Sequence, residues 1–173
     1  TPQAPSSPIS SSPSSNPSEL FITSQKIEAE NGEVLDGAYR VNDKSAELAS
    51  NNAYVNLGDR ANSKSPEVKF VTSNLEAGKY RVEVHYTKYV NNTPEYREPD
   101  YQNLYINDDP NPIQIKYVKT FGDEPPHIPK WSDNLDTVVR LQRGSNTIKI
   151  KNNNPNFPGT VSIDYIFISR IGA

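Results

Sequence analysis

The sequence predicts an all-β protein, built as an antiparallel β-sandwich of the jelly-roll type. Apolar and polar residues alternate over many short runs, as they do in strands that bury one face against a core. Turn signals such as Glu76–Gly78, Asn107–Pro110 and Arg143–Asn146 separate the runs. No stretch has a convincing helical period, so we expect about nine or ten half-buried strands joined by turns.

The expected strands follow one another from residue 26 to residue 169. The clearest is Tyr80–Tyr86, in which every second residue is Tyr or Val and the residues between them are Arg, Glu and His. Successive side chains of a strand point to opposite faces, so His85 belongs to the polar face and is expected to be exposed to solvent. In chain order the expected strands are Lys26–Glu30, Ala53–Leu57, Val68–Phe70, Tyr80–Tyr86, Leu104–Ile106, Ile113–Tyr117, Val139–Leu141, Ile148–Ile150 and Val161–Ser169.

Residues 1–20 are predicted to form a Pro/Ser-rich linker, and residues 21–173 a single folded module. Ile9 is the only large apolar residue between Thr1 and Ser18, so this segment cannot bury enough apolar surface to offset the entropy of ordering it. A Pro-rich segment of this kind is extended and semi-stiff. We expect it to join the module to something upstream; a tail without a role is the alternative.

Composition and charge exclude several classes of protein. A formal net charge of −3 and a pI near 5.4 argue against nucleic-acid binding, because there is no basic stripe to meet phosphates. No apolar run approaches the roughly 20 residues needed to cross a bilayer, so no membrane span is expected. The chain has no Cys, which rules out a disulfide framework, a thiol nucleophile and a thiolate metal site.

Three acidic residues at the two ends of the module suggest a metal site. Asp164 lies inside the apolar last strand, where an ionised carboxylate is not buried without a partner. Glu28 and Glu30 are two positions apart in the first expected strand and would share one of its faces. Side by side, three carboxylates repel one another unless a cation lies between them, and oxygen-only ligands suit calcium. We predict neighbouring first and last strands held by a structural Ca²⁺; surface acids paired with Lys or Arg are the alternative.

Two connections are too long to be simple turns. Lys88–Tyr101 carries Tyr89 and Tyr96, and Lys119–Asn134 carries Trp131, the only tryptophan of the chain. Long loops within a compact domain are uncommon and are often functional. Polar loops that present aromatic rings from a rigid sandwich are typical of a recognition surface.

Five motifs follow one another along the folded part of the chain. They are Ile27–Glu30, Asn51–Asp59, Leu75–Val82 followed by the loop with Trp131, Leu141–Ile148 and Ser162–Ile166. Their order resembles that of the carbohydrate-binding modules of family 35, which are closely related to family 6. The resemblance covers about Lys26–Ser169, essentially the whole folded part. It implies a jelly-roll sandwich with a structural calcium near the chain ends, and a non-catalytic module joined by a linker to a plant-polysaccharide-degrading enzyme.

The resemblance also implies roles for individual residues. Carried over position by position, Glu28, Glu30 and Asp164 would hold the structural calcium, together with backbone carbonyls. One sugar site would lie at the loop end of the sandwich, with one ring from Tyr54 and one from Trp131. Tyr54 points away from the core residues Ala53 and Val55, which fits a flat platform for a pyranose ring.

The polar half of this sugar site departs from the family pattern. The family often has Asn two residues before the closing Asp, whereas this chain has Ser162. The Asn-rich loop just before it could supply the amides instead, and Asn154 and Asn156 are the candidates there. The expected carbohydrate-binding residues are therefore Tyr54, Trp131, Asn154, Asn156 and Ser162.

The expected function is that of a secreted, extracellular and monomeric module that has no catalytic activity. It would bind a polysaccharide or oligosaccharide of the plant cell wall and keep a tethered catalytic domain near its substrate, with no nucleic-acid or membrane partner. Binding would raise the effective concentration of the tethered catalytic domain at its substrate. Mannan, galactosylated chains, xylan and uronic-acid polymers all remain open as the ligand, as does a second calcium.

Two other functions stay open. A small β-sandwich glycosidase or lyase would need two carboxylates flanking one bond, and Asp123, Glu124 and Asp133 near Trp131 are the candidates. Their spacing does not distinguish them from solvated loop acids. A structural or adhesion module would keep the calcium and lack sugar binding.

Overall fold

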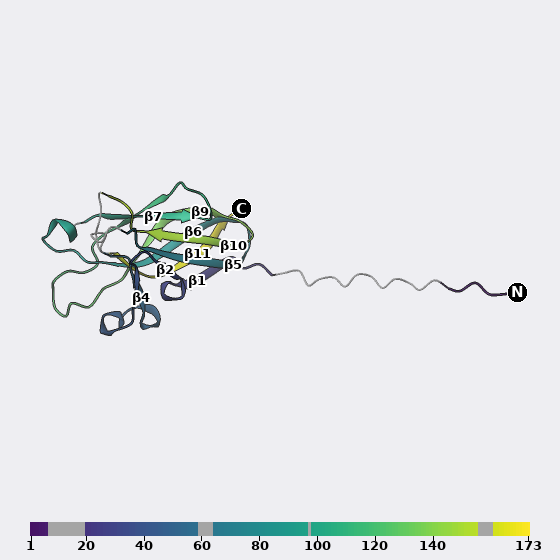
Figure 1. Cartoon of the computed structure of the whole chain (residues 1–173), viewed down its shortest axis with the longest axis horizontal. Helices are drawn as coiled ribbons and strands as arrows, with labels where there is room; N and C mark the ends of the chain where they lie inside the picture. Colours follow the sequence, from purple (N-terminus) through teal and green to yellow (C-terminus); the bar gives the residue numbers. More distant parts are fainter. Residues whose placement is uncertain (7–19, 59–63, 97, 156–160) are drawn as a thin grey trace.

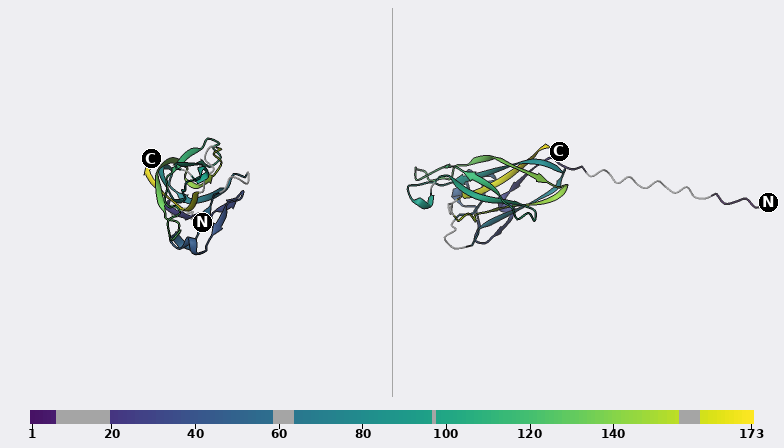
Figure 2. Two further views of the ribbon diagram at one scale, coloured as in Figure 1. Left: turned by 90° about the vertical axis from the view of Figure 1, so that its left-hand side faces the viewer. Right: turned by 90° about the horizontal axis from the view of Figure 1, so that it is seen from above.

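The computed structural model describes residues 1–6, 20–58, 64–96, 98–155 and 161–173. Most of the predicted linker therefore lies outside the described residues, and its boundary at residue 20 stays a prediction. Within the described residues, two antiparallel sheets lie face to face (Figures 1 and 2), which confirms the predicted β-sandwich of jelly-roll type.

Sheet A has five strands in the order β2-β5-β10-β7-β8. Its central strand β10 pairs along most of its length with β5 on one side and, from Ile148 to Lys151, with β7 on the other. The bounds of its strands are Glu33–Leu35 for β2, Glu67–Leu75 for β5, Asp100–Ile106 for β7, Ile113–Tyr117 for β8 and Gly144–Lys151 for β10.

Sheet B has six strands, five of them in the order β3-β4-β11-β6-β9. The first strand, β1, pairs with the second half of the last strand, β11, while β4 pairs with its first half. The bounds are Ser24–Glu28 for β1, Tyr39–Val41 for β3, Tyr54–Asn56 for β4, Gly78–Lys88 for β6, Ser132–Leu141 for β9 and Val161–Gly172 for β11.

The main core lies between the two sheets and is built by the alternation seen in the sequence. In β6, the residues predicted to point inward are buried, while those between them stay at least partly accessible. Apolar surface removed from water in this way contributes roughly 25 cal/mol per Å². The largest side chains of this core are Tyr80, Tyr86, Tyr117, Phe70, Leu57, Leu75, Leu104 and Leu141.

Each of the nine expected strands is present, and two short ones were missed. β2 and β3 have three residues each, which is too short for an alternating pattern to stand out from a loop. The first expected strand also ends earlier than predicted. β1 stops at Glu28, and the next residues form the 3₁₀ helix η1, Ala29–Asn31.

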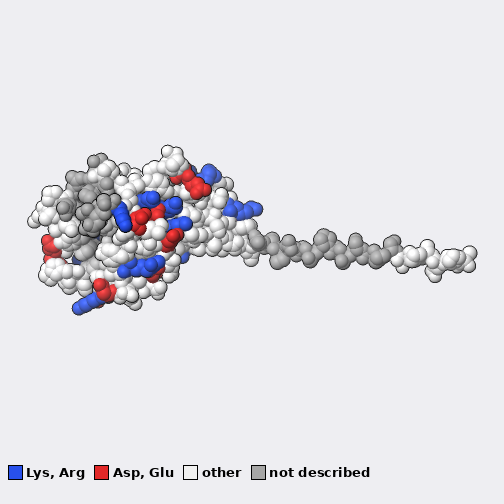
Figure 3. All heavy atoms as spheres, in the orientation of Figure 1, with Lys and Arg blue, Asp and Glu red and all other residues white. Residues whose placement is uncertain are grey.

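Short 3₁₀ helices and two long loops complete the chain. η2, Lys44–Ala46, and η3, Ser50–Asn52, follow β3, and η5, Pro94–Tyr96, lies in the β6–β7 connection. That connection and the β8–β9 connection extend at the end of the sandwich where β6 stops, on the left in Figure 1. Among the described residues no helix has the length and apolar character needed to cross a membrane. Figure 3 shows acidic and basic side chains interspersed on the visible face.

Candidate functional site

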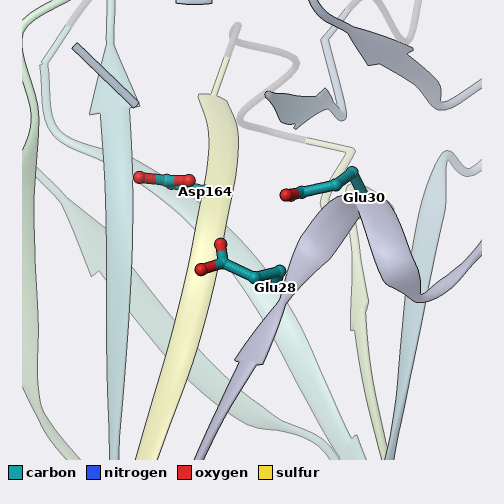
Figure 4. A group of neighbouring side chains, drawn as sticks. All are labelled: Glu28, Glu30 and Asp164. Carbon is teal, nitrogen blue, oxygen red and sulfur yellow. The ribbon is translucent and has the colours of Figure 1, made fainter. Parts of the chain in front are cut away.

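Three carboxylates meet where the first and last strands run side by side. Glu28 ends β1, Glu30 follows in η1 and Asp164 projects from β11 (Figure 4). One oxygen from each group lies within 4.8 Å of the others. The expected convergence is therefore present, although Glu30 reaches the cluster from a helical turn and not from the face of a strand.

Strand pairing explains why these residues converge. β1 runs antiparallel to β11 with Glu28 opposite Tyr165, which confirms that the first and last strands are neighbours. The register between β11 and β6 shifts between Ile163 and Tyr165, so Asp164 is the additional residue of a β-bulge. A bulge leaves its extra residue unpaired and redirects its side chain. Asp164 consequently turns toward the end of β1, while the pairing of β11 with β6 runs in register from Tyr165 to Arg170.

The turn of η3 closes one side of the cluster. The backbone N–H of Ser50 donates to Asp164 Oδ2 at 2.8 Å, and its hydroxyl donates to Glu28 Oε1 at 2.6 Å. Lys26 Nζ lies 3.2 Å from the same Glu28 oxygen, and Asn51 Nδ2 donates to Glu30 Oε1 at 3.4 Å. Each carboxylate thus has one oxygen held by the protein.

The other oxygen of each carboxylate is buried with no hydrogen-bond partner among the described residues. These atoms are Glu28 Oε2, Glu30 Oε2 and Asp164 Oδ1. Burial, reinforced by the two glutamates, raises the pKa of Asp164 to about 7. Burial also raises the pKa of Glu30. Three carboxyl groups that come this close together, each with one unsatisfied oxygen, fit a hard divalent cation, whose preferred ligands are carboxylates and carbonyls.

The two aromatic residues predicted to form a sugar site are neighbours. The ring centroids of Tyr54 and Trp131 are 5.2 Å apart in an edge-on arrangement. Tyr54 is only 6% exposed, because it packs with Ala46 and Ala49 of the segment around η2 and η3. Its hydroxyl lies 3.1 Å from Ser45 Oγ. Tyr54 does face away from the main core as expected, but the open platform is absent because this segment covers it. Sugar contact through this pair stays a prediction.

His85 is not the exposed residue that the alternation suggested. Its ring lies between those of Trp131 and Tyr165, with centroids 5.7 and 4.5 Å away and nearly parallel planes. His85 Nδ1 lies 2.6 Å from Asp133 Oδ1, and its Nε2 lies 3.7 Å from Asp164 Oδ2. The ring stack therefore connects the start of β9 to the carboxylate cluster.

The described polar residues predicted for the sugar site, Ser162 and Asn154, lie in different segments of the chain. Ser162 is buried in β11 between Asn56 of β4 and Thr87 of β6. Asn154 is half-buried in the segment after β10. Asn156 lies outside the described residues. Their roles in binding remain predictions.

The two long loops enclose a hollow of about 380 Å³ at the end of the sandwich. Its walls are Val90, Asn91, Asn92, Lys119, Asp123 and Glu124. Three rings support these walls, with Tyr89 packed against both Tyr96 and Phe121 at 5.3 Å. The sequence indicated that these loops are functional but did not indicate which of their residues line the hollow. A loop has no periodicity from which to infer where each side chain points.

The acids considered for catalysis are divided between two places. Asp123 and Glu124 line the hollow, where Asp123 accepts a hydrogen bond from the Tyr89 hydroxyl and Glu124 lies 3.9 Å from Lys119 Nζ. Asp133 is paired with His85 on the outer face of sheet B.

Solved structures with the same fold include isolated carbohydrate-binding modules. A family 35 module from Clostridium thermocellum matches with a TM-score of 0.62 and 22% identity, over 84% of this chain and 98% of that one. The native structure of a family 35 module from the same organism matches with a TM-score of 0.62 and 16% identity, over 87% and 100%. The GH26-CBM35 β-(1,4)-mannanase of Podospora anserina matches with a TM-score of 0.62 and 18% identity, over 87% of this chain and 28% of that enzyme.

In the enzymes among the first matches, this chain spans at most 29% of the whole length. No protein-family model matches the sequence, and no curated protein sequence does either. The similarity is thus one of structure at low sequence identity. It establishes that the chain has the fold of family 35 carbohydrate-binding modules.

Proposed function

We propose that this chain is a non-catalytic, secreted carbohydrate-binding module of the family 35 type that targets an attached enzyme to plant cell-wall polysaccharide. The observation that carries the proposal is the hollow between the two long loops. Amide and charged side chains line it, and the rings of Tyr89, Tyr96 and Phe121 pack against one another within the same two loops. A binding site of this size needs only a few placed polar groups to orient a ligand. The shared fold with isolated modules supports the same conclusion.

Binding would combine contacts from both loops. Asn91 and Asn92 offer amide groups to sugar hydroxyls, while Lys119, Asp123 and Glu124 offer charged ones. The hollow is open to water, so solvent competes for each hydrogen bond. We therefore expect weak binding, on the order of 10–1000 µM, or about −7 to −4 kcal/mol. An attached enzyme gains from such binding through a higher effective concentration at the polysaccharide.

A structural calcium ion is part of the proposal. Glu28, Glu30 and Asp164 would hold it through the three oxygens that have no other described partner. When bound, the ion neutralises the carboxylates and joins both ends of the folded region. It would act on stability and not on the sugar directly, because the cluster lies between β1 and β11 rather than in the loop-end hollow.

Affinity electrophoresis tests the binding proposal. Gels containing mannan, galactan, xylan or a uronic-acid polymer should retard the protein in at least one case. Asn92→Ala, at the exposed rim of the hollow, should reduce retardation, whereas Asn42→Ala, an exposed Asn after β3, should not. Trp131→Ala tests, in the same gels, the prediction that the rings of Tyr54 and Trp131 contact the sugar. Absence of retardation on every polysaccharide would refute the proposal.

Two further outcomes separate the alternatives. Release of reducing sugar from any of these polysaccharides by this chain alone would favour the small glycosidase or lyase, and Asp123 and Glu124 would then be the first acids to replace. If the protein binds calcium but no sugar polymer changes its electrophoretic mobility, that result would favour a structural or adhesion role.

A further inference from the structure

Strand β9 forms a long free edge of sheet B. It has ten residues, whereas β3, at the opposite edge of the same sheet, has three. Among the described residues β9 pairs with β6 alone, and no backbone hydrogen bond joins residues 136–140 to any other described segment. An edge strand leaves a row of N–H and C=O groups unpaired, so it can pair with a strand of another chain.

The exposed side chains of this segment follow the order acid, apolar residue, base. Asp136 and Arg140 are exposed, and Val138 between them is 39% exposed, while Thr137 and Val139 point the other way and are buried. Directly opposite residues of an antiparallel pair lie on the same face. If two such segments pair with Val138 at the centre, Asp136 of each copy lies opposite Arg140 of the other. The segment is therefore complementary to itself.

The basic groups beside this segment lack acidic partners. Lys79 of β6 lies directly opposite Arg140, and Arg81 lies opposite Val138. Like charges directly opposite across strands destabilise a sheet. No carboxylate among the described residues lies within ion-pair distance of Lys79, Arg81 or Arg140. An acid supplied by another molecule would relieve this repulsion.

A bulge at one end of the segment limits how far pairing can extend. The register between β9 and β6 shifts by one residue just before Thr137, which places Leu135 and Asp136 in the bulge. Asn134 Oδ1 accepts from the Asp136 N–H there at 3.1 Å. Bulges and edge charges usually prevent edge-to-edge pairing. Here an acid stands at the position that meets Arg140 in a second copy, so the charges that discourage other strands favour this one.

We propose that residues 136–140 of β9 are a self-association surface, where two copies of this chain pair antiparallel about a twofold axis at Val138. The two sheets B would form one continuous sheet, and two Asp136–Arg140 ion pairs would flank the central valines. The contact is small, so the dimer should be weak and should form only as the protein concentration rises. Such a dimer would replace the monomer expected from the sequence. It does not depend on sugar binding, because this edge shares no residue with the loop-end hollow.

Cysteine substitution at the twofold axis tests the register. The chain has no Cys, so Val138→Cys gives each molecule one thiol, which meets the same thiol of a second copy. Opposite residues of an antiparallel pair have Cα atoms about 4.5–5.5 Å apart, a separation that a disulfide can join. Mild oxidation should therefore convert this variant to a covalent dimer.

Val71→Cys in β5 of sheet A is the matched control. Val71 is 57% exposed, against 39% for Val138, so oxidation through random collision would favour the control. Equal yields of covalent dimer in the two variants, or a higher yield in the control, would overturn the proposal.

Charge reversal tests the ion pairs in the chain without cysteine. Sedimentation velocity over a series of concentrations should show a reversible dimer of the parent protein. Asp136→Arg or Arg140→Asp alone places like charges opposite each other and should weaken the dimer about tenfold. The variant with both reversals exchanges acid and base, so it should dimerise as the parent does. Both side chains are exposed, so the melting temperatures should stay unchanged.

Three results of this series would overturn the surface. The first is a parent protein that stays monomeric at every concentration. The second is a single variant that dimerises as strongly as the parent, and the third is a double variant that is no stronger than the single ones. Because the test contains no sugar, none of these results bears on the proposed carbohydrate binding.

Discussion

Ser50 donates its backbone N–H to Asp164 Oδ2 at 2.8 Å, although 114 positions separate the two residues in the chain. The contact fixes one oxygen of a fully buried carboxylate and leaves the other without a described partner. The same serine holds Glu28 through its hydroxyl. The turn of η3 therefore fixes the acids in a geometry that electrostatic repulsion alone would disperse, which is the behaviour expected of a cation site.

Removing calcium should lower the melting temperature. A cation bound only by the folded state contributes RT ln(1 + [L]/Kd), about 2.7 kcal/mol when its concentration is 100 times the Kd. For a domain of this size that corresponds to roughly 5–10 °C. Differential scanning calorimetry with calcium and with EDTA measures the difference. Asp164→Asn should abolish it, while Asp136→Asn, an exposed acid of β9, should retain it. Identical melting curves of the parent protein in the two buffers would contradict the site.

The calcium-free protein should become less stable as pH rises from about 4 to about 7. Burial raises the pKa of Asp164 from its ordinary 3.8 to about 7. Between these values the folded state holds a proton that the unfolded state has released, so the free energy of unfolding falls with increasing pH. Calcium affinity should change in the opposite direction, rising up to about pH 7, because the metal competes with that proton. Urea unfolding in EDTA across this range measures the slope, and a flat profile would show that Asp164 titrates normally.

Sequence reasoning identified the fold and the acidic cluster because both rest on local patterns. Strict alternation over Tyr80–Tyr86 defines which residues enter the core, and an acid inside the apolar run Val161–Ser169 is conspicuous. Those two patterns do not depend on how the loops fold. In the structure, the strands pack around one core and the acids meet where β1 lies beside β11. Both arrangements follow from burial.

What the sequence could not give depends on tertiary contacts. Nothing local shows that η2 and η3 fold over Tyr54, or that His85 is enclosed between Trp131 and Tyr165. The bulge at Asp164 is equally hidden, since its register shift is a property of the pairing with β6. The pairing of Lys79 with Arg140 likewise requires the register between two strands that are far apart in the chain.

Calcium binding should change the fluorescence of Trp131, the only tryptophan. The Trp131 ring stacks on His85, whose Nε2 lies 3.7 Å from Asp164 Oδ2. A cation on that carboxylate alters the field at the imidazole and therefore the surroundings of the indole. Emission should change saturably during a calcium titration, with the midpoint that calorimetry gives for binding. The change should be absent in Asp164→Asn, and unaltered emission at calcium saturation would show that the stack does not sense the site.

Breaking the buried Lys88–Asp100 pair should be costly, whereas replacing both partners should not. Lys88 Nζ lies 3.1 Å from Asp100 Oδ2, and both side chains are almost completely buried. Burial lowers the pKa of Lys88. Lys88→Met leaves a carboxylate in a dry interior and should reduce the free energy of unfolding by about 3–5 kcal/mol, while Lys88→Met with Asp100→Leu should recover most of it.

Urea denaturation measures both variants of this pair, with Lys116→Met, an exposed lysine of β8, as the control. If the single Lys88→Met variant were no less stable than that control, the pair would not be desolvated. If the double variant were as unstable as the single one, the cost would come from packing and not from an uncompensated charge. Comparing the loss of unfolding free energy in the single and double variants therefore separates the electrostatic cost from the packing cost. The pair joins the last residue of β6 to the first residue of β7.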